Sequence, residues 1–252
     1  MDIATLGGLI LGVSAVVIAF VMEGGQLGMV IKAPAIIIVV FGTIGAGMIT
    51  TSFQTVVRIP TYLRIALSAT KYDPIATINE IIRMAERARR EGILGLEEYL
   101  RAITDPFFKN AIQLVIDGTE VTVLRDILET EMIYTSERHK SGITLFSKLG
   151  GFAPTLGIIG TVMGLIHALS STDDASKMAS AIAVAFIATL WGIGTANLFY
   201  LPISDKLRYR HEDEMFKYQL ITEGVVAIQS GDNPRVIRTK LMSFMNSNLR
   251  ED

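Results

Sequence analysis

Residues 153–165 read APTLGIIGTVMGL and lie within 149–172, a run of the sequence that carries no charged side chain. A charge-free run of about 20 residues is long enough to cross a hydrocarbon core about 30 Å thick as an α-helix. These 13 residues include three glycines, two threonines and one proline, which a helix that only anchors a protein in lipid does not need. The stretch therefore predicts a membrane span with a further task.

Three more runs are charge-free and of similar length: 3–22, 33–57 and 178–203. Of the 23 Lys and Arg residues, 21 lie in 58–148 or after residue 203. No Lys or Arg precedes the first run and no convincing small-residue cleavage site follows it, so we expect a true span rather than a secretory signal. The sequence thus predicts an all-α integral membrane protein with four transmembrane helices.

The distribution of charge also predicts how the chain is divided. Basic residues follow the second and fourth spans and precede the third, so the positive-inside rule places these segments and both termini in the cytoplasm. The segment 58–148 holds 13 acidic and 13 basic residues, which indicates a solvated surface. The predicted parts are transmembrane helices 1 and 2 (1–57), a helical cytoplasmic insertion (58–148), transmembrane helices 3 and 4 (149–203) and a helical cytoplasmic tail (204–252).

Capping signals predict the helices of the insertion and the tail. Asp73 followed by Pro74 is typical of a helix start, and Gly92 suits its end. The further segments predicted, in chain order, are a short helix at 96–103, a helix ending at Gly118, a long helix from Thr122 into the third span, a continuation of the fourth span, and a break at SGDNP (230–234) before a last short helix.

Small residues share one face of each of the last two spans. At 100° per residue they gather on the third span (Ala153, Pro154, Gly157, Gly160, Thr161, Gly164, Ala168) and on the fourth (Ala181, Ala185, Ala188, Thr189, Gly192, Thr195, Ala196). Singly, such features indicate close helix packing in lipid, threonines bonded to their own backbone, and prolines that only kink a helix. Their combination on two adjacent spans favours a lining for another helix or for an ion.

The spans contain no Asp, Glu, Lys or Arg. Ion carriers and proton relays normally hold an ionisable group within the membrane. His167 is the only titratable residue of the third span, and its place near the outer end is typical of an interfacial residue. If ions cross here, we expect the acidic group to come from another chain.

The same composition argues against several other classes of protein. A secondary transporter with its own site would need charge or broken helices at mid-depth, and a hydrolase would need a nucleophile beside a base. We therefore expect no enzymatic activity. The chain has no cysteine, hence no disulfide and no thiolate metal site, and its net charge of −2 predicts no nucleic-acid partner.

Three segments carry a resemblance to a known family: GGFAPTLGIIGTVMGLIHAL (150–169), AIAVAFIATLWGIGTANLFYLPISDKL (181–207) and AIQSGDNPRVI (227–237). With four spans and a large insertion after the second, they closely resemble the MotA/PomA flagellar stator subunits, and more distantly ExbB and TolQ. The resemblance implies a ring of five such chains in the bacterial inner membrane, around a dimer of a MotB-like single-span partner. It further implies that torque passes to the rotor's switch protein and that no cofactor is needed besides the coupling ion.

The resemblance also implies roles for residues of the last two spans, which line the ion path in this family. Pro154 matches the proline beside the partner's ion-carrying aspartate, and Pro202 matches the fourth-span proline. Gly157, Thr161 and Thr189 complete the residues assigned to the path. Thr161 is typical of sodium-type members and Ala188 is not, so the coupling ion is H⁺ or Na⁺ with a lean to sodium.

The rotor contact implied by the resemblance is an arginine three residues before a glycine and a glutamate five residues after it. In RREGILGLEE (89–98) this pattern gives Arg89 and Glu97, while Arg90 and Glu98 stand beside them and remain candidates. Without the resemblance, such a charge cluster indicates a solvated surface. The alternative function is an ExbB/TolQ-like energiser of outer-membrane processes, against which the number of spans argues.

Overall fold

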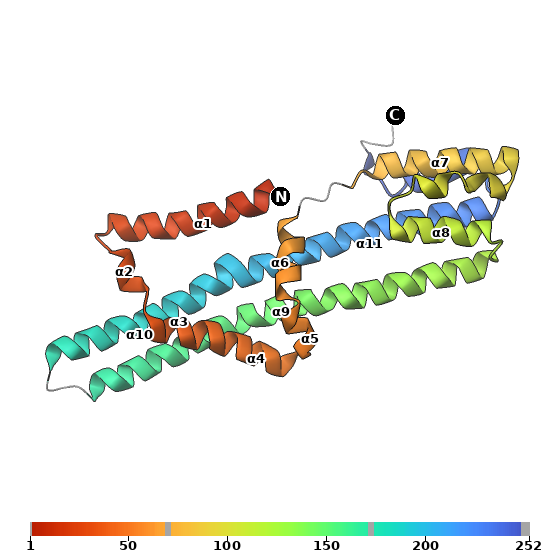
Figure 1. The fold of residues 1–252 in the computed structure, drawn as a ribbon. Helices are drawn as coiled ribbons and strands as arrows, with labels where there is room; N and C mark the ends of the chain where they lie inside the picture. The colour runs from red at the N-terminus through yellow and green to blue at the C-terminus, as the bar shows by residue number, and fades with distance from the viewer. Residues whose placement is uncertain (1, 69–71, 171–173, 248–252) are drawn as a thin grey trace. The chain divides into compact units, whose positions relative to one another are not determined.

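The computed structural model describes residues 2–68, 72–170 and 174–247, and all regular secondary structure within them is helical (Figure 1). The chain divides into two compact units. The first unit comprises 1–70 and 139–210, and the second comprises 71–138 and 211–252. These bounds follow packing, whereas the predicted membrane boundaries follow charge, so those boundaries stay predictions.

Four helices are long and apolar enough to cross a membrane, as predicted: Ile3–Met22, Ala33–Thr50, Val121–Leu169 and Ala175–Gln229. The elements that belong to the first unit are α1 (Ile3–Met22), α2 (Leu27–Val30), α3 (Ala33–Ile36), the π-helical η1 (Ile37–Phe41), α4 (Gly42–Thr50), α5 (Phe53–Val57), α6 (Ile59–Leu67), the later part of α9 (Val121–Leu169), α10 (Ala175–Thr195), the π-helical η4 (Ala196–Tyr200) and the start of α11 (Leu201–Gln229).

In the second charge-free run, 33–57, the helix stops at Thr50, seven residues before the run ends. Thr51 is extended, and Ser52 caps the short α5 by accepting a hydrogen bond from the backbone N–H of Thr55. The hydroxyls of Thr50 and Thr51 both donate to the Gly47 carbonyl, at 3.1 and 3.0 Å. Such local bonds offer the backbone an alternative to the helix, which explains the break.

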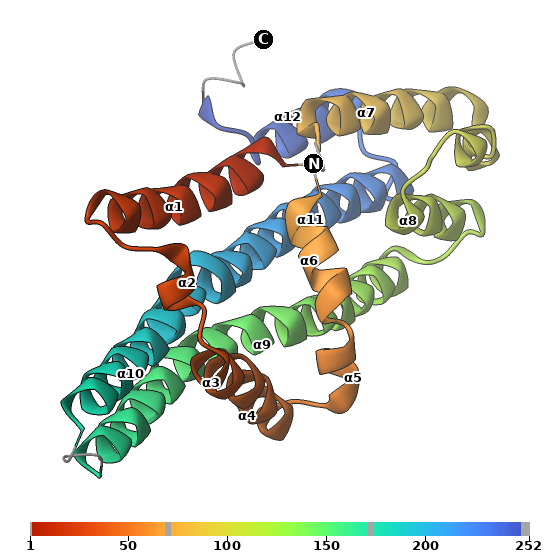
Figure 2. The same ribbon diagram turned by 60° about the vertical axis from the view of Figure 1, so that its left-hand side comes forward.

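Helices α9 and α10 run side by side in the first unit, and α3 and α4 lie against them (Figure 2). Glycines allow this close contact: an added Cβ at Gly42 would lie 3.3 Å from Leu156, and one at Gly47 would lie 2.8 Å from Leu149. Trp191 of α10 donates its indole N–H to the Val30 carbonyl at 2.8 Å. This bond pairs a carbonyl at the end of α2, where the helix leaves it without an intrahelical partner.

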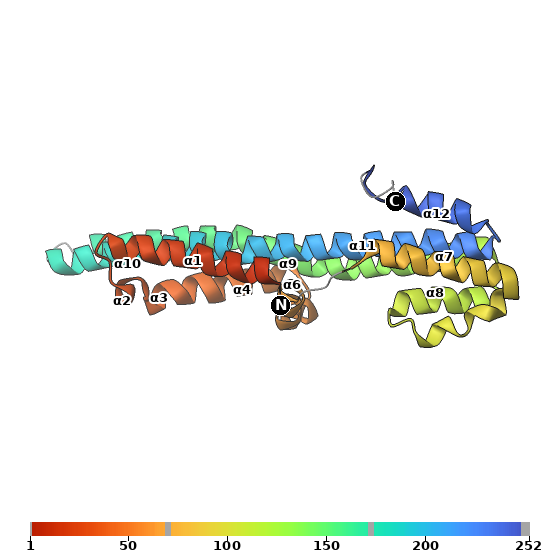
Figure 3. The same ribbon diagram turned by 90° about the horizontal axis from the view of Figure 1, so that it is seen from above.

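The second unit holds α7 (Pro74–Glu91), the 3₁₀ turns η2 (Ile93–Leu96) and η3 (Tyr99–Arg101), α8 (Pro106–Ile116), α12 (Pro234–Met242) and the remaining parts of α9 and α11 (Figure 3). The Asp73 carboxylate caps α7 by accepting from Ala76 N–H, and Gly92 ends it with φ +81°. Both predicted signals are confirmed. No single helix covers 96–103: η2 ends at Leu96, and the 3₁₀ turn η3 takes up Tyr99–Arg101.

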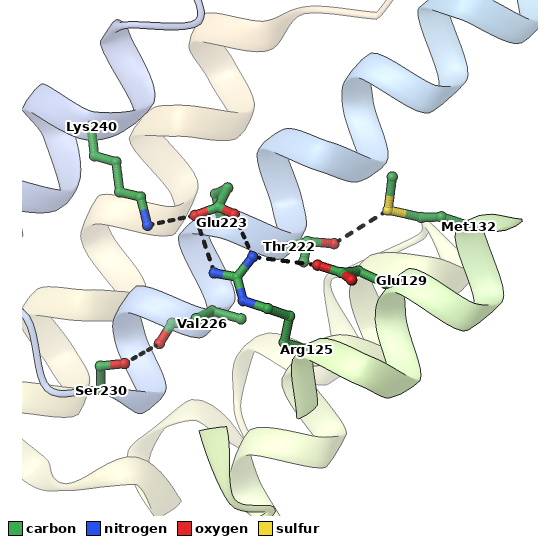
Figure 4. A network of polar contacts seen from close by, with 8 residues as sticks. All are labelled: Arg125, Glu129, Met132, Thr222, Glu223, Val226, Ser230 and Lys240. Carbon is green, nitrogen blue, oxygen red and sulfur yellow. Dashed lines mark hydrogen bonds and ion pairs between the residues drawn. The ribbon is translucent and has the colours of Figure 1, made fainter. Parts of the chain in front are cut away.

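An ion-pair network joins three helices of the second unit (Figure 4). The Arg125 guanidinium lies 2.6 Å from the Glu223 carboxylate, which also pairs with Lys240 at 2.5 Å. A hydrogen bond from Arg125, and one from Lys240, hold the pKa of Glu223 below its ordinary value. The network therefore binds α9, α11 and α12 together around an apolar core that includes Leu124 and Leu220.

Candidate functional site

The small faces of α9 and α10 pack directly on each other. A Cβ added at Gly157 would lie 2.9 Å from the Ala188 carbonyl oxygen, and one at Gly164 would lie 2.7 Å from the Ala185 Cβ. On the facing helix, a Cβ added at Gly192 would lie 2.6 Å from the Ala153 carbonyl oxygen. Close packing between helices, the simpler of the two interpretations of these faces, is thus what the single chain shows.

Oxygen atoms gather within this helix pair. The Thr161 hydroxyl lies 3.1 Å from the Gly157 carbonyl, 2.9 Å from the Ala185 carbonyl, and in hydrogen-bond contact with the Thr189 hydroxyl. The contact to Gly157 is the i−4 backbone bond anticipated for a threonine on this face. One hydroxyl donates a single hydrogen, so these acceptors compete for it. The result is an uncharged group of two hydroxyls and two carbonyls inside an otherwise apolar helix pair.

The two prolines lie in different surroundings. Pro154 is half-buried within α9, one turn before Gly157, and cannot donate to the Gly150 carbonyl. Pro202 is exposed, follows the wide turn η4, and lines a hollow beside α1. The structure thus brings Gly157, Thr161 and Thr189 into one site, whereas Pro202 contributes to another surface of the first unit.

A charged cluster in the first unit joins residues about 200 positions apart in the sequence. The Asp2 carboxylate caps α1 and pairs with Lys206 at 2.5 Å and Arg210 at 3.0 Å. The hydrogen bond from Lys206, assisted by backbone N–H groups, lowers the pKa of Asp2 to about 2. Arg210 also donates to the Ser68 carbonyl. The cluster fixes the start of α1 to the start of α11, and sequence reasoning missed it because no local pattern links the two.

The candidate rotor-contact residues lie at the end of α7 and beyond it. Arg89, Arg90, Glu97 and Glu98 are all exposed. Glu98 pairs with Arg87 at 2.8 Å, and Arg87 also pairs with Glu91 at 2.8 Å. Arg89, Arg90 and Glu97 form no ion pair among the described residues. Sequence reasoning missed Arg87, although its spacing of four residues from Glu91 is typical of a helical ion pair.

Comparison with known proteins identifies the family. A model of the MotA/TolQ/ExbB proton channel family matches residues 100–220. Motility protein A of Borreliella burgdorferi is 37% identical over 97% of this chain and 94% of its own length. Chemotaxis protein PomA of Vibrio alginolyticus is 38% identical over 99% of this chain and 98% of its own. The chain belongs to the MotA/PomA family.

The family relation extends to three dimensions. A chain in the solved structure of C. jejuni MotAB superposes with a TM-score of 0.92 at 30% identity, covering 98% of this chain and 97% of that one. The residues matched by the family model include all of α10 and the membrane part of α9, so the small-residue site lies where the MotA/TolQ/ExbB families are alike. Four apolar helices and this family membership identify an integral membrane protein. Among the described residues no cluster of His, Cys, Asp and Glu is suited to a metal ion.

Proposed function

We propose that this chain is the membrane subunit of a flagellar motor stator, which couples the flow of H⁺ or Na⁺ to rotation. The observation that carries the proposal is similarity over nearly the whole chain to Motility protein A and PomA sequences and to a MotAB structure. Four spans free of Asp, Glu, Lys and Arg fit this function. Such a chain depends on a second subunit for the ion-carrying group.

The α9–α10 helix pair is the proposed wall of the ion path. Its oxygens at Thr161 and Thr189 are neutral, whereas ion carriers and proton relays normally hold an ionisable group within the membrane. An aspartate from a MotB-like single-span partner would supply that group. Gly157 contributes its carbonyl to the oxygen group, and Pro154 lies one turn before Gly157 on the same helix. Pro202 is proposed to act at the end of the fourth span.

Sodium is the proposed coupling ion. Two hydroxyls and two carbonyls form a set of hard oxygen ligands, which a proton does not require. The close contact between Thr161 and Thr189 supports a joint role for these two hydroxyls. Ala188, by contrast, offers only a methyl group and no oxygen ligand, which favours a proton as the coupling ion.

The proposed orientation has both termini in the cytoplasm of a bacterial inner membrane. The ion pairs of Asp2 with Lys206 and Arg210 support it, because they hold the N-terminus beside the basic residues that follow the fourth span. Large apolar side chains of α9, among them Ile158, Val162 and Ile166, are exposed in the single chain. They are available to lipid or to other subunits, and we propose a ring of five copies around a dimer of the partner.

The rotor's switch protein is proposed to contact the surface at the end of α7. Exposed charges steer a partner and fix its orientation, and unpaired charges are available for that purpose. Arg89 and Glu97 satisfy this condition, whereas Glu98 is engaged by Arg87. We therefore propose Arg89 and Glu97 as the principal contacts, with Arg90 beside them. An ExbB/TolQ-like energiser shares the family model but is disfavoured by the four spans.

Ion flux in vesicles tests the proposal. The chain reconstituted alone should pass Na⁺ and H⁺ at the background rate of empty vesicles. Co-reconstitution with the MotB-like subunit, freed of any segment that plugs it, should raise the flux, and an Asp→Asn change in that subunit's span should abolish the rise. A large flux through the chain alone would contradict the borrowed carboxylate.

A further inference from the structure

A hollow in the first unit lies between α1 and the segment that leads from η4 into α11. It has a volume of about 510 Å³ and is lined mostly by apolar groups, including those of Leu9 and Leu198. We call it the α1–α11 groove. No residue of α1 is buried, and the groove runs along the first half of α1, from Ala4 to Leu9.

Both ends of the groove are closed by contacts. At one end, Asp2 holds Lys206 and Arg210. At the other, Gly12 lies so close to Leu198 that an added Cβ would be 3.2 Å from the leucine side chain. The ten residue steps from Asp2 to Gly12 rise by about 15 Å, which bounds the length of the opening.

These dimensions limit what can occupy the groove. One turn of an α-helix, about 10 Å across and 5.4 Å high, has a volume on the order of 400 Å³. A helix lying along the 15 Å between the two contacts would need about three such turns, roughly 1,200 Å³, and would not fit within a hollow of about 510 Å³. A thin, flexible apolar chain fits, and in a membrane such chains surround the protein.

The polarity of the lining changes along the groove. Gly8, Leu9 and Leu198 line the part towards the middle of the span, while Asp205, Lys206 and Tyr209 line the part beyond its end. Tyr209 is 52% exposed, and the Lys206 ammonium lies 5.2 Å from the centre of its ring. Tyrosine and lysine are typical of the membrane–water interface. An occupant with an apolar tail and a polar head matches this gradient.

We propose that the α1–α11 groove binds one acyl chain of a membrane phospholipid, with the lipid headgroup beside Lys206 and Tyr209. The lipid fills the space between α1 and α11 and supports α1 where no protein side chain does. This inference requires only that the chain is embedded in a membrane, and it does not rest on the proposed motor function.

Two neighbouring glycines provide a matched pair of variants. A Cβ at Gly7 or at Gly8 meets no atom within 4 Å, so a larger residue is sterically allowed at both positions. Only Gly8 lines the groove. Gly8→Leu therefore fills the groove, while Gly7→Leu makes the same chemical change on the same helix outside it.

The test uses a phosphatidylcholine with a photoreactive diazirine in its acyl chain, incorporated into phosphatidylethanolamine–phosphatidylglycerol vesicles with the full-length chain and its partner. After irradiation, labelled peptides are mapped by mass spectrometry, with the exposed Ile18 as an internal reference for ordinary surrounding lipid. We expect strong labelling of peptides that carry Leu9 and Leu198. If the new leucine side chain displaces two methylene groups of the acyl chain from the groove, we expect about a tenfold loss of this labelling in Gly8→Leu.

Labelling should stay unchanged in Gly7→Leu. If the Gly8→Leu variant assembles poorly, Gly8→Ala serves in its place, and its smaller side chain should give an intermediate loss of labelling. Equal labelling in all variants would overturn the proposal, as would no labelling above the Ile18 reference in the unsubstituted chain. The chain has no cysteine, so a Leu9→Cys variant reports a competing occupant. Disulfide-linked dimers formed through Cys at this position would assign the groove to a second copy instead.

Discussion

The contact between α9 and α10 predicts a large difference between two glycines only two residues apart. In Gly192→Ala, the new Cβ would lie 2.6 Å from the Ala153 carbonyl oxygen and 3.0 Å from the Gly157 Cα. Both are backbone atoms, so no side chain can turn aside. In Gly194→Ala, the new Cβ meets nothing within 4 Å.

The magnitude follows from this geometry. Ordinary contact begins at 3.4 Å, so the helices must separate by about 0.8 Å at Gly192, and a gap of that size forfeits roughly a quarter to a half of the dispersion energy of each contact. Overpacking of this kind typically costs about 1–3 kcal/mol. Both variants gain about 1 kcal/mol of helix propensity, which cancels between them. We expect Gly192→Ala to be less stable than Gly194→Ala by about 1–3 kcal/mol, or roughly 5- to 150-fold in the folding equilibrium.

Thermal unfolding of the purified complex in detergent measures this difference, with the single tryptophan as the fluorescence reporter. Gly194→Ala should unfold at or above the temperature of the unsubstituted chain, and Gly192→Ala several degrees below it. Swimming should follow the same order, because separation of the helices also disturbs the bond from Thr161 to the Ala185 carbonyl. Equal stability of the two variants would refute the close packing of the small faces.

Three further predictions address other parts of the chain. Trp191→Phe keeps an aromatic ring but leaves the Val30 carbonyl unpaired, which should lower the free energy of unfolding by about 1–3 kcal/mol. Circular dichroism measures this loss, and unchanged stability would show that the bond at 2.8 Å contributes nothing. Two basic partners depress the pKa of Glu223. The stabilisation from these ion pairs is therefore complete above the ordinary glutamate pKa of 4.5, and it is lost as pH falls through the lower pKa of the folded state. Glu223→Gln should flatten the acid side of the stability–pH curve, and an unchanged curve would argue against the pairing. Glu97→Lys should reduce torque in tethered cells far more than Glu98→Lys, with equal amounts of assembled complex, and the opposite order would transfer the rotor contact to Glu98.

Periodicity and charge sufficed for much of the fold because they are local properties. The four spans, the helix capped by Asp73 and ended by Gly92, and the small faces of α9 and α10 all follow from spacing within a single helix. The helix break at Thr51 accompanies hydroxyl bonds to Gly47, which offer the backbone an alternative to helix continuation. The absence of charge therefore marks a run, 33–57, that extends seven residues beyond the helix it contains.

The candidate site was predictable in its residues but not in its contacts. Thr161 and Thr189 were recognisable on their own helices, whereas their meeting depends on the register between α9 and α10 that the glycines set. The Asp2 cluster and the bond from Trp191 to Val30 join distant parts of the chain, and no periodic pattern in a single sequence connects such residues.

Rotation of tethered cells tests the central claim most directly, in a strain whose only stator contains this chain, as external sodium is varied at constant pH. We predict rotation whose speed rises with sodium and saturates, and a Thr161→Ala variant that needs more sodium to reach the same speed. Speed that ignores sodium but collapses with a protonophore would contradict the sodium assignment and leave a proton-driven stator. Rotation that continues unchanged when the chain is deleted would contradict the stator function itself.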